Sequence, residues 1–266
     1  MTVVEMTASA DGTAIAFDRF GEGPPLILVR GAFNDRMTAA ELAELLAPSF
    51  TVFNYDRRGR GDSGDTKPYA VEREIEDLEA VIDAAGGSAA LYGHSSGAQL
   101  ALETAARGVS VTRLAMYEPP YFVDDSRPLK SDDYLVRMER AIAKGRGRDA
   151  AEQFMTEAVG MPAEMVGQLL NSPMGARLEK LAHTLPYDER IMERYQLGRP
   201  LPAEWRDSVT VPTLVMDGGN SPEWIRNAAR ALLQRLPDVQ YRTLEGLDHT
   251  DDPAALAPVL ETFLAR

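Results

Sequence analysis

Short apolar runs of strand length alternate with segments of helical periodicity along most of the chain, and this alternation constrains the fold more than any other feature. Apolar runs typical of buried strands occupy residues 25–29, 51–55, 89–92, 111–117, 213–216 and 239–244. Helical spacing is found at residues 38–47, 71–85, 98–107, 225–236 and 253–264. Residues 13–19 instead alternate apolar and polar side chains, as a half-buried antiparallel strand does. The pattern predicts an α/β fold with a mostly parallel central sheet covered by helices on both faces.

The alternation stops between residues 125 and 205, where glycines and prolines separate short helical stretches and no strand-like run is present. A structureless loop of this length is uncommon in a compact domain. We therefore predict a helical cap at residues 125–205, inserted into one core domain made of residues 1–124 and 206–266. Ligands of such sheets bind at the carboxyl ends of the strands, so the cap is expected to lie over that edge and to supply the substrate pocket.

Composition disfavours several classes of partner. The net charge of −13 argues against nucleic acid, whose phosphates are bound by Lys and Arg, and against an anionic membrane surface. The chain has no cysteine, which removes disulfides and thiolate metal sites and fits a reducing compartment. Residues 1–6 have neither a basic region nor a long apolar run. We therefore expect a cytoplasmic protein without a signal peptide or a membrane span.

The motifs predict neither a cofactor nor a metal ion. Residues 59–64 fit the G-x-G-x-x-G pattern of dinucleotide sites, but they do not lead directly into the next predicted helix, as such a site requires. No group of His, Asp and Glu residues has the spacing of metal ligands. The sequence leaves a homodimer open.

A candidate nucleophile lies at residues 93–97, which read Gly-His-Ser-Ser-Gly between a predicted strand and a predicted helix. This is the setting of a nucleophile elbow, a turn that holds its serine in a strained conformation. Only small residues two positions before and after that serine leave room for the turn. The pattern predicts Ser95 as the nucleophile, and the alternative is a glycine-rich helix start with an incidental serine.

Two further motifs accompany the elbow in chain order. Residues 55–64 (YDRRGRGDSG) follow the strand that precedes the elbow strand, and residues 245–249 (EGLDH) follow the last strand. With these three motifs the chain resembles, over nearly its whole length, the α/β-hydrolase superfamily in its serine hydrolase type with a helical cap. The resemblance implies the α/β-hydrolase fold and a hydrolytic activity.

A serine hydroxyl is a weak nucleophile and needs an adjacent base, which in turn needs an orienting carboxylate. The chain has three histidines, and the resemblance implies that His249 is the base. The alternative is a polar loop residue. His94 is expected to pack or to hydrogen-bond beside the nucleophile, and His183 to be an exposed or cap-packing residue.

The acid of the triad departs from the usual pattern. Ser221 stands where the family carries an aspartate after its seventh strand, and Asp217 comes four residues earlier. Glu118, at the end of the neighbouring predicted strand, is the acid that we favour, with Asp217 as the alternative. The alternative interpretation of Glu118 is a solvated carboxylate before a Pro-Pro turn, and that of Asp217 is a turn residue. Three acids near His249 in sequence are expected to cap a helix or to lie on the surface: Asp248, Asp251 and Asp252.

Attack on a carbonyl builds an oxyanion, which two backbone N–H groups usually stabilise. The resemblance assigns them to Ser96, directly after the nucleophile, and to Ala32 in the loop after residues 25–29. Gly31 would allow the close approach of this loop. Arg30 replaces the histidine that is common in the family, either in a structural salt bridge or as a positive charge near the pocket.

Together these residues predict a serine hydrolase that cleaves a small, hydrophobic ester or lactone through an acyl-enzyme. The expected partner is therefore a small-molecule acyl substrate. Two alternatives stay open: hydrolysis of a C–C bond or a thioester by the same triad, and a small-ligand receptor of the same fold without turnover. The intact Ser95 and His249 weigh against the receptor, and the irregular acid position weighs slightly for it.

Overall fold

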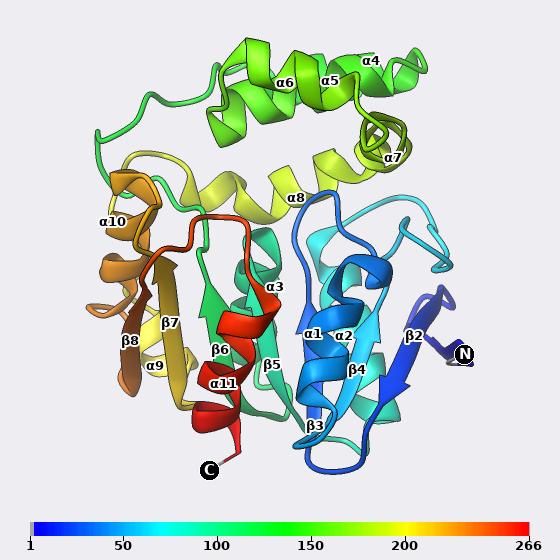
Figure 1. Ribbon diagram of the computed structural model, residues 1–266, viewed down its shortest axis with the longest axis vertical. Coiled ribbons are helices and arrows are strands. Elements are labelled where there is room, and N and C mark those ends of the chain that lie inside the picture. The colour runs from blue at the N-terminus through cyan, green and yellow to red at the C-terminus, as the bar shows by residue number, and fades with distance from the viewer. Residues whose placement is uncertain (1–2, 266) are drawn as a thin grey trace.

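The computed structural model describes residues 3–265, and an eight-stranded sheet forms its centre (Figure 1). The strands are β1 (Glu5–Ala8), β2 (Ala14–Phe20), β3 (Pro25–Val29), β4 (Thr51–Tyr55), β5 (Ala89–His94), β6 (Val111–Tyr117), β7 (Thr213–Gly218) and β8 (Val239–Leu244). Their order across the sheet is β1-β2-β4-β3-β5-β6-β7-β8. Every neighbouring pair from β4 to β8 is parallel, whereas β2 runs antiparallel to β1 and to β4. The predicted mostly parallel sheet of the α/β-hydrolase fold is confirmed.

Helices cover both faces of this sheet. After a 3-10 turn (Arg36–Ala39), α1 (Ala40–Leu46) packs beside α11 (Pro253–Leu264) on one face (Figure 1). The other face is covered by α2 (Val71–Ala84), α3 (Ser96–Ala106) and α10 (Glu223–Leu232), with the short α9 (Trp205–Ser208) beside them. A buried apolar cluster therefore lies on each side of the sheet and fixes the strand ends that carry the site. Within residues 3–265 no helix has the length and apolar character needed to cross a lipid bilayer.

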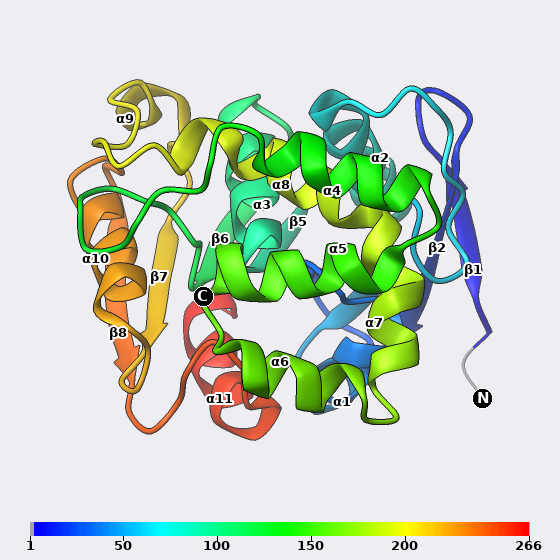
Figure 2. The same ribbon diagram turned by 90° about the horizontal axis from the view of Figure 1, so that it is seen from above.

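Five helices between β6 and β7 lie over one edge of the sheet (Figures 1 and 2). They are α4 (Tyr134–Ala143), α5 (Gly147–Gln153), α6 (Ala163–Leu170), α7 (Gly175–Leu181) and α8 (Leu185–Met192). A π-helical turn (Phe154–Val159) continues α5, and 3-10 turns flank α8 at Ala182–Thr184 and Glu193–Tyr195. We call these five helices the cap helices.

The cap helices have an apolar cluster of their own, which includes Met138, Met155 and Leu185. At its C-terminal end α8 packs on the core, because Ile191 belongs to the core cluster. Trp205, further along the chain, belongs to the core cluster too. Helix α8 is thus the element in which cap packing passes into core packing. This matters for the site, since α8 is the cap helix that reaches the nucleophile turn.

Candidate active site

Ser95 lies on the turn between β5 and α3, with φ 56° and ψ −129°, a backbone conformation that L-residues rarely adopt. The flanking glycines make the turn possible. A Cβ on Gly93 would lie 2.5 Å from Ala98 Cα, and one on Gly97 would lie 2.2 Å from the carbonyl oxygen of Val29. Both positions therefore exclude a side chain, and the turn presents the Ser95 hydroxyl at the cap-facing edge of the sheet.

The structure brings Ser95, His249 and Glu118 together. The His249 Nε2 atom lies 3.2 Å from Ser95 Oγ, and its Nδ1 atom lies 2.8 Å from Glu118 Oε2. A neutral imidazole that donates from Nδ1 to the carboxylate accepts the serine hydroxyl at Nε2, which is the tautomer that a general base needs. Glu118 is fully buried, whereas the His249 side chain is 35% exposed. The base is thus accessible to water while its orienting acid is not.

Glu118, and not Asp217, is the acid at the histidine. Glu118 has a left-handed backbone (φ 49°), and its Oε1 atom accepts hydrogen bonds from the Gly218 amide (2.7 Å) and from the Ser221 hydroxyl. Asp217 is equally buried but accepts from the Tyr241 hydroxyl on β8 (2.7 Å). Ser221, which stands in place of the usual aspartate, thus donates a hydrogen bond to the carboxylate of Glu118 at the end of the neighbouring strand.

Side chains from the ends of the core strands hold the loop that carries His249. The Tyr117 hydroxyl donates to the Asp248 carbonyl (2.6 Å), and His94 Nε2 donates to the His249 carbonyl (3.0 Å). Burial lowers the pKa of His94 to about 3, so this imidazole is neutral at neutral pH. His94 therefore hydrogen-bonds beside the nucleophile, as the sequence predicts.

The prediction that Asp251 caps a helix or lies on the surface is wrong. Asp252 is the residue that caps α11, accepting from the Ala254 and Ala255 amides, while Asp251, whose side chain is 10% exposed, pairs with the buried Arg30. Arg30 Nη2 lies 2.9 Å from Asp251 Oδ1, and the Tyr92 hydroxyl donates to the same carboxylate at 3.3 Å. Burial would raise the pKa of Asp251, but the charges around it and the hydrogen bond from Arg30 outweigh burial and hold that pKa below its ordinary value. Sequence reasoning missed this partner because 221 residues separate it from Arg30.

The residues of the two predicted oxyanion donors lie beside the nucleophile. Ser96 is the first residue of α3, and the loop that carries Ala32 lies against Ser95, since a Cβ on Gly31 would be 2.8 Å from Ser95 Cβ. Among residues 3–265, neither the Ala32 nor the Ser96 amide has a hydrogen-bond acceptor. Two free N–H groups beside a serine hydroxyl are suited to bind a developing oxyanion.

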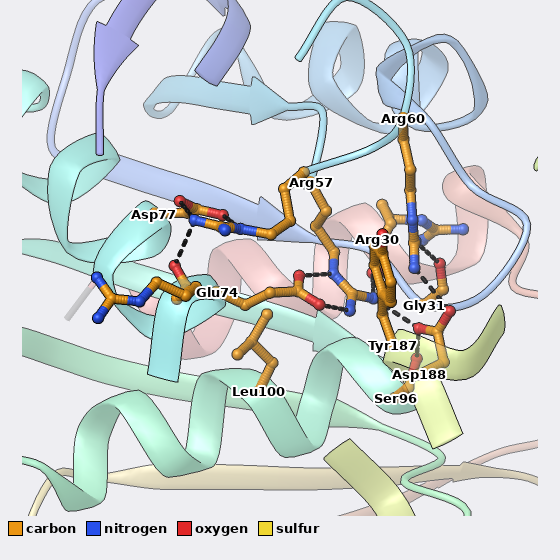
Figure 3. A network of polar contacts seen from close by, with 12 residues as sticks. Arg30, Gly31, Arg57, Arg60, Glu74, Asp77, Ser96, Leu100, Tyr187 and Asp188 are labelled. Atoms are coloured by element: carbon orange, nitrogen blue, oxygen red, sulfur yellow. Dashed lines mark hydrogen bonds and ion pairs between the residues drawn. The ribbon is translucent and has the colours of Figure 1, made fainter. Parts of the chain in front are cut away.

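A cluster of buried charged side chains, which the sequence did not predict, contacts Ser96 and the loop of Ala32 (Figure 3). Asp188, on α8, accepts from the Ser96 hydroxyl (2.6 Å), from Arg57 Nη1 (2.7 Å) and from Arg60 Nη2 (2.7 Å). The side chains of Arg57, Arg60 and Asp188 are 2%, 1% and 2% exposed. The two arginines stand in the motif at residues 55–64, but nothing local in the sequence marks Asp188 as their partner.

The cap helices also reach the loop that carries Ala32 through apolar contacts. Phe33, directly after Ala32, packs edge-to-face on Phe154 with ring centroids 5.5 Å apart. His183 is exposed and lines a surface groove of about 410 Å³ with Lys67 and Tyr187. The π-helical turn Phe154–Val159 is therefore one cap element that packs on the loop of Ala32.

No group of three or more His, Asp or Glu side chains within residues 3–265 is arranged to hold a metal ion. The groups assembled around Ser95 are a hydroxyl, an imidazole, a carboxylate and two amides, which suit nucleophilic attack followed by proton transfer.

The family model described as "Alpha/beta hydrolase family" matches residues 26–259. The chain is also similar to a solved alpha/beta hydrolase from Sphaerobacter thermophilus DSM 20745, with 54% sequence identity and a TM-score of 0.92, over 97% of this chain and 99% of that one. This likeness covers the core, the cap helices and the site together.

Two curated relatives are more distant. The N-formylmaleamate deformylase of Pseudomonas putida is 37% identical over 148 residues, which are 53% of this chain and 55% of that protein. The match thus spans about half the length of the deformylase. The 2-(acetamidomethylene)succinate hydrolase of Mesorhizobium japonicum is 26% identical over 243 residues, 86% of this chain and 82% of that protein.

Proposed function

This chain belongs to the alpha/beta hydrolase family, and on that premise we propose that it is a serine hydrolase that cleaves a small acyl compound through an acyl-enzyme on Ser95. The observation that carries the proposal is the continuous hydrogen-bonded chain from Ser95 through His249 to the buried Glu118. Half of the polypeptide separates Ser95 from His249, so their contact is a product of the whole fold.

In the first half-reaction His249 takes the hydroxyl proton while Ser95 Oγ attacks the acyl carbon. The amides of Ala32 and Ser96 bind the oxyanion, and Glu118 stabilises the imidazolium that forms. The bond to the leaving group then breaks, and His249 gives its proton to that group. In the second half-reaction His249 deprotonates water, whose oxygen attacks the acyl carbon. The bond to Ser95 Oγ then breaks, His249 returns the proton to Oγ, and the carboxylic acid leaves.

Esters and lactones are the substrates that we propose first, because an alkoxide leaving group needs less assistance from the protonated His249 than the amine of an amide does. Amides are the second candidate. The names of two relatives support them, since one is a deformylase of an N-formyl compound and the other a hydrolase of an acetamido compound. The same catalytic groups also suit the hydrolysis of a thioester or of a C–C bond. These substrates would differ from esters in the contacts that position them.

Labelling with a fluorophosphonate probe tests the serine mechanism. We expect the folded wild type to be labelled and Ser95→Ala to stay unlabelled, because the probe reacts only with an activated serine. Ser126→Ala, which changes an exposed serine in the segment before the cap helices, is the matched control and should label as the wild type does. Folded wild-type protein that fails to label would favour a ligand receptor without turnover.

A substrate panel separates the acyl classes. Purified protein is assayed with p-nitrophenyl acetate and butyrate, a γ-lactone and a δ-lactone, an S-acyl thioester and an N-formyl amide. We expect Ser95-dependent turnover of at least one ester or lactone. If only the N-formyl amide is turned over, the amide candidate replaces the ester.

A further inference from the structure

The oxyanion loop and the nucleophile turn are both tied to one carboxylate of the cap helices (Figure 3). Arg60 Nη2 donates to Asp188 Oδ2 at 2.7 Å, and its Nη1 donates to the Gly31 carbonyl at 2.5 Å. Asp188 Oδ1 accepts the Ser96 hydroxyl at 2.6 Å. A single Arg–Asp pair therefore contacts the residues that precede or carry both predicted oxyanion donors.

The contact with Gly31 has a specific geometric consequence. The Gly31 carbonyl and the Ala32 N–H belong to the same peptide group, and this bond is trans, so the two point in opposite directions. A guanidinium that holds the carbonyl thus fixes the direction of the amide, and its charge polarises the peptide so that the N–H becomes a better donor. Rotation of this peptide would turn the N–H toward Arg60, where it would meet a donor in place of an acceptor.

We propose that Arg60 and Asp188 are positioning residues, which hold the Gly31–Ala32 peptide with its N–H toward the acyl oxygen and so make the oxyanion site depend on the docking of α8. This inference rests on the proposed function, because the oxyanion exists only if Ser95 attacks an acyl group. The residues do not touch the substrate themselves.

The charges of the cluster support a fixed geometry. Burial would raise the pKa of Asp188, but the positive charges of Arg60 and Arg57 outweigh it and hold that pKa below its ordinary value. The second arginine is shared, since Arg57 forms two 2.7 Å hydrogen bonds to the buried Glu74 and one of 3.1 Å to the Arg30 carbonyl. Two arginines thus face two carboxylates, and every charge in the cluster has a partner.

A neighbouring pair provides a matched control. Arg58, which lies between the two arginines of the cluster in sequence, forms two 2.7 Å hydrogen bonds to Asp77, and the side chains are 0% and 1% exposed. This pair is as buried as Arg60 and Asp188, yet it contacts neither the loop of Ala32 nor Ser96. Any effect that follows only from breaking a buried ion pair will appear in variants of both pairs.

The experiment compares Arg60→Met and Asp188→Asn with Asp77→Asn. With a substrate found in the panel, we expect the first two variants to lower kcat about 30- to 100-fold while KM stays within about threefold, since an oxyanion donor acts in the transition state. Phenylboronic acid, which forms a tetrahedral adduct on the serine, should bind more weakly by a similar factor. Asp77→Asn should keep kcat and boronate affinity within about twofold.

Hydrogen exchange of the peptide that covers residues 30–34 gives a readout that does not depend on turnover. We expect exchange there to be at least about tenfold faster in Asp188→Asn than in Asp77→Asn, because the loop loses its tie to α8. An absence of wild-type labelling and turnover would count against the proposed function, whereas this exchange ratio reports on the positioning role alone. Equal exchange in the two variants, or kcat losses as large in Asp77→Asn, would overturn the inference.

If the single variants do not fold, the charge-balanced double variant Arg60→Met with Asp188→Leu replaces them, because it leaves Arg57 paired with Glu74. It removes the donor to the Gly31 carbonyl without an unpaired buried charge. The same loss of kcat and of boronate affinity is expected. A folded double variant with wild-type kcat would refute the positioning role.

Discussion

The two sides of the candidate site are held by different parts of the molecule. On the base side, the loop of His249 is tied to the ends of core strands through Arg30, Tyr117 and His94. On the oxyanion side, the loop of Ala32 is tied through Arg60 to a residue of α8, in the cap helices. Each side uses a buried Arg–Asp pair, but the carboxylate of the base side belongs to the core, and that of the oxyanion side belongs to the cap.

This difference indicates which part of the catalytic machinery a movement of the cap helices can influence. The base, its acid and the nucleophile follow β8, β6 and β5, three strands of one sheet, so the contacts that join these three groups lie within the core. The oxyanion donors depend on a contact that a movement of α8 would break. A change in the core should therefore affect proton transfer, and a change at α8 should affect stabilisation of the transition state.

The largest effect is expected at the acid of the base side. Glu118→Gln should lower kcat about 10³- to 10⁴-fold, because the amide cannot stabilise an imidazolium and favours the wrong tautomer of His249. Asp217→Asn should keep kcat within about threefold, since Asp217 bonds to Tyr241 and not to the histidine. Both variants are assayed for turnover of an activated ester. Loss of turnover in Asp217→Asn, with a near-normal Glu118→Gln, would reverse this assignment.

The acid also illustrates what the sequence could predict. The elbow and the loop of His249 are local motifs, which follow β5 and β8. Four strands have the predicted bounds: Pro25–Val29, Thr51–Tyr55, Val111–Tyr117 and Val239–Leu244. The choice between Glu118 and Asp217 is not local, because it depends on which strand end faces the imidazole. The sequence favoured Glu118 because Ser221 fills the usual place of the acid, and the structure adds that Ser221 bonds to Glu118.

The next effect concerns stability on the base side. Arg30→Met leaves the mostly covered Asp251, 10% exposed, without its main partner and should reduce the free energy of unfolding by about 3 kcal/mol. The loss of kcat should be about tenfold, because Tyr117 and His94 still hold the loop of His249. Urea denaturation and ester turnover measure the two effects.

Arg19→Met is the control for this change. Arg19 pairs with Glu5 at side-chain exposures of 55% and 40%, and its loss should cost no more than about 0.5 kcal/mol. If Arg30→Met is no more destabilising than Arg19→Met, the buried pair does not hold the base side together.

Buried ion pairs are also where sequence reasoning failed. Asp251 stands beside the capping residue Asp252 and has the same local surroundings in sequence, so no local pattern separates a buried partner of Arg30 from a helix cap. Asp188 is likewise one acid of an amphipathic cap helix, and its partner Arg60 lies 128 residues earlier. The strand β1 was missed for a different reason, because an edge strand with alternating half-buried and exposed residues carries little apolar signal.

A smaller effect is expected from pH, again on the base side. The pKa of His94 is lowered by burial to about 3 in the folded protein, with the neighbouring Arg30 and His249 acting in the same direction and Asp251 opposing them. In the unfolded chain it is about 6.5. Between these values the unfolded state binds a proton that the native state does not, so stability falls as the pH falls below about 6.5. At pH 5 this histidine alone should cost about 2 kcal/mol relative to pH 7.

Urea denaturation at pH 7 and pH 5 measures this dependence. His94→Gln, which can still donate to the His249 carbonyl, should lose about 2 kcal/mol less than the wild type between the two pH values. His183→Gln removes an exposed histidine and should leave the difference unchanged. An unchanged difference in His94→Gln would mean that the native protein also protonates this imidazole, and that the base side is more open than the structure indicates.

The smallest effect tests whether packing or charge ties the oxyanion side to the cap. Phe154→Leu removes the edge-to-face contact with Phe33 and should reduce the free energy of unfolding by about 1 kcal/mol. Because Arg60 and Asp188 still hold the Gly31–Ala32 peptide, kcat should change by less than about threefold. In the Asp188→Asn background, Phe154→Leu should lower kcat by a larger factor than it does in the wild type, since both contacts hold the same loop. A loss of kcat in Phe154→Leu as large as that in Asp188→Asn would instead assign the position of the loop to aromatic packing, and the charged cluster would then serve only to dock α8.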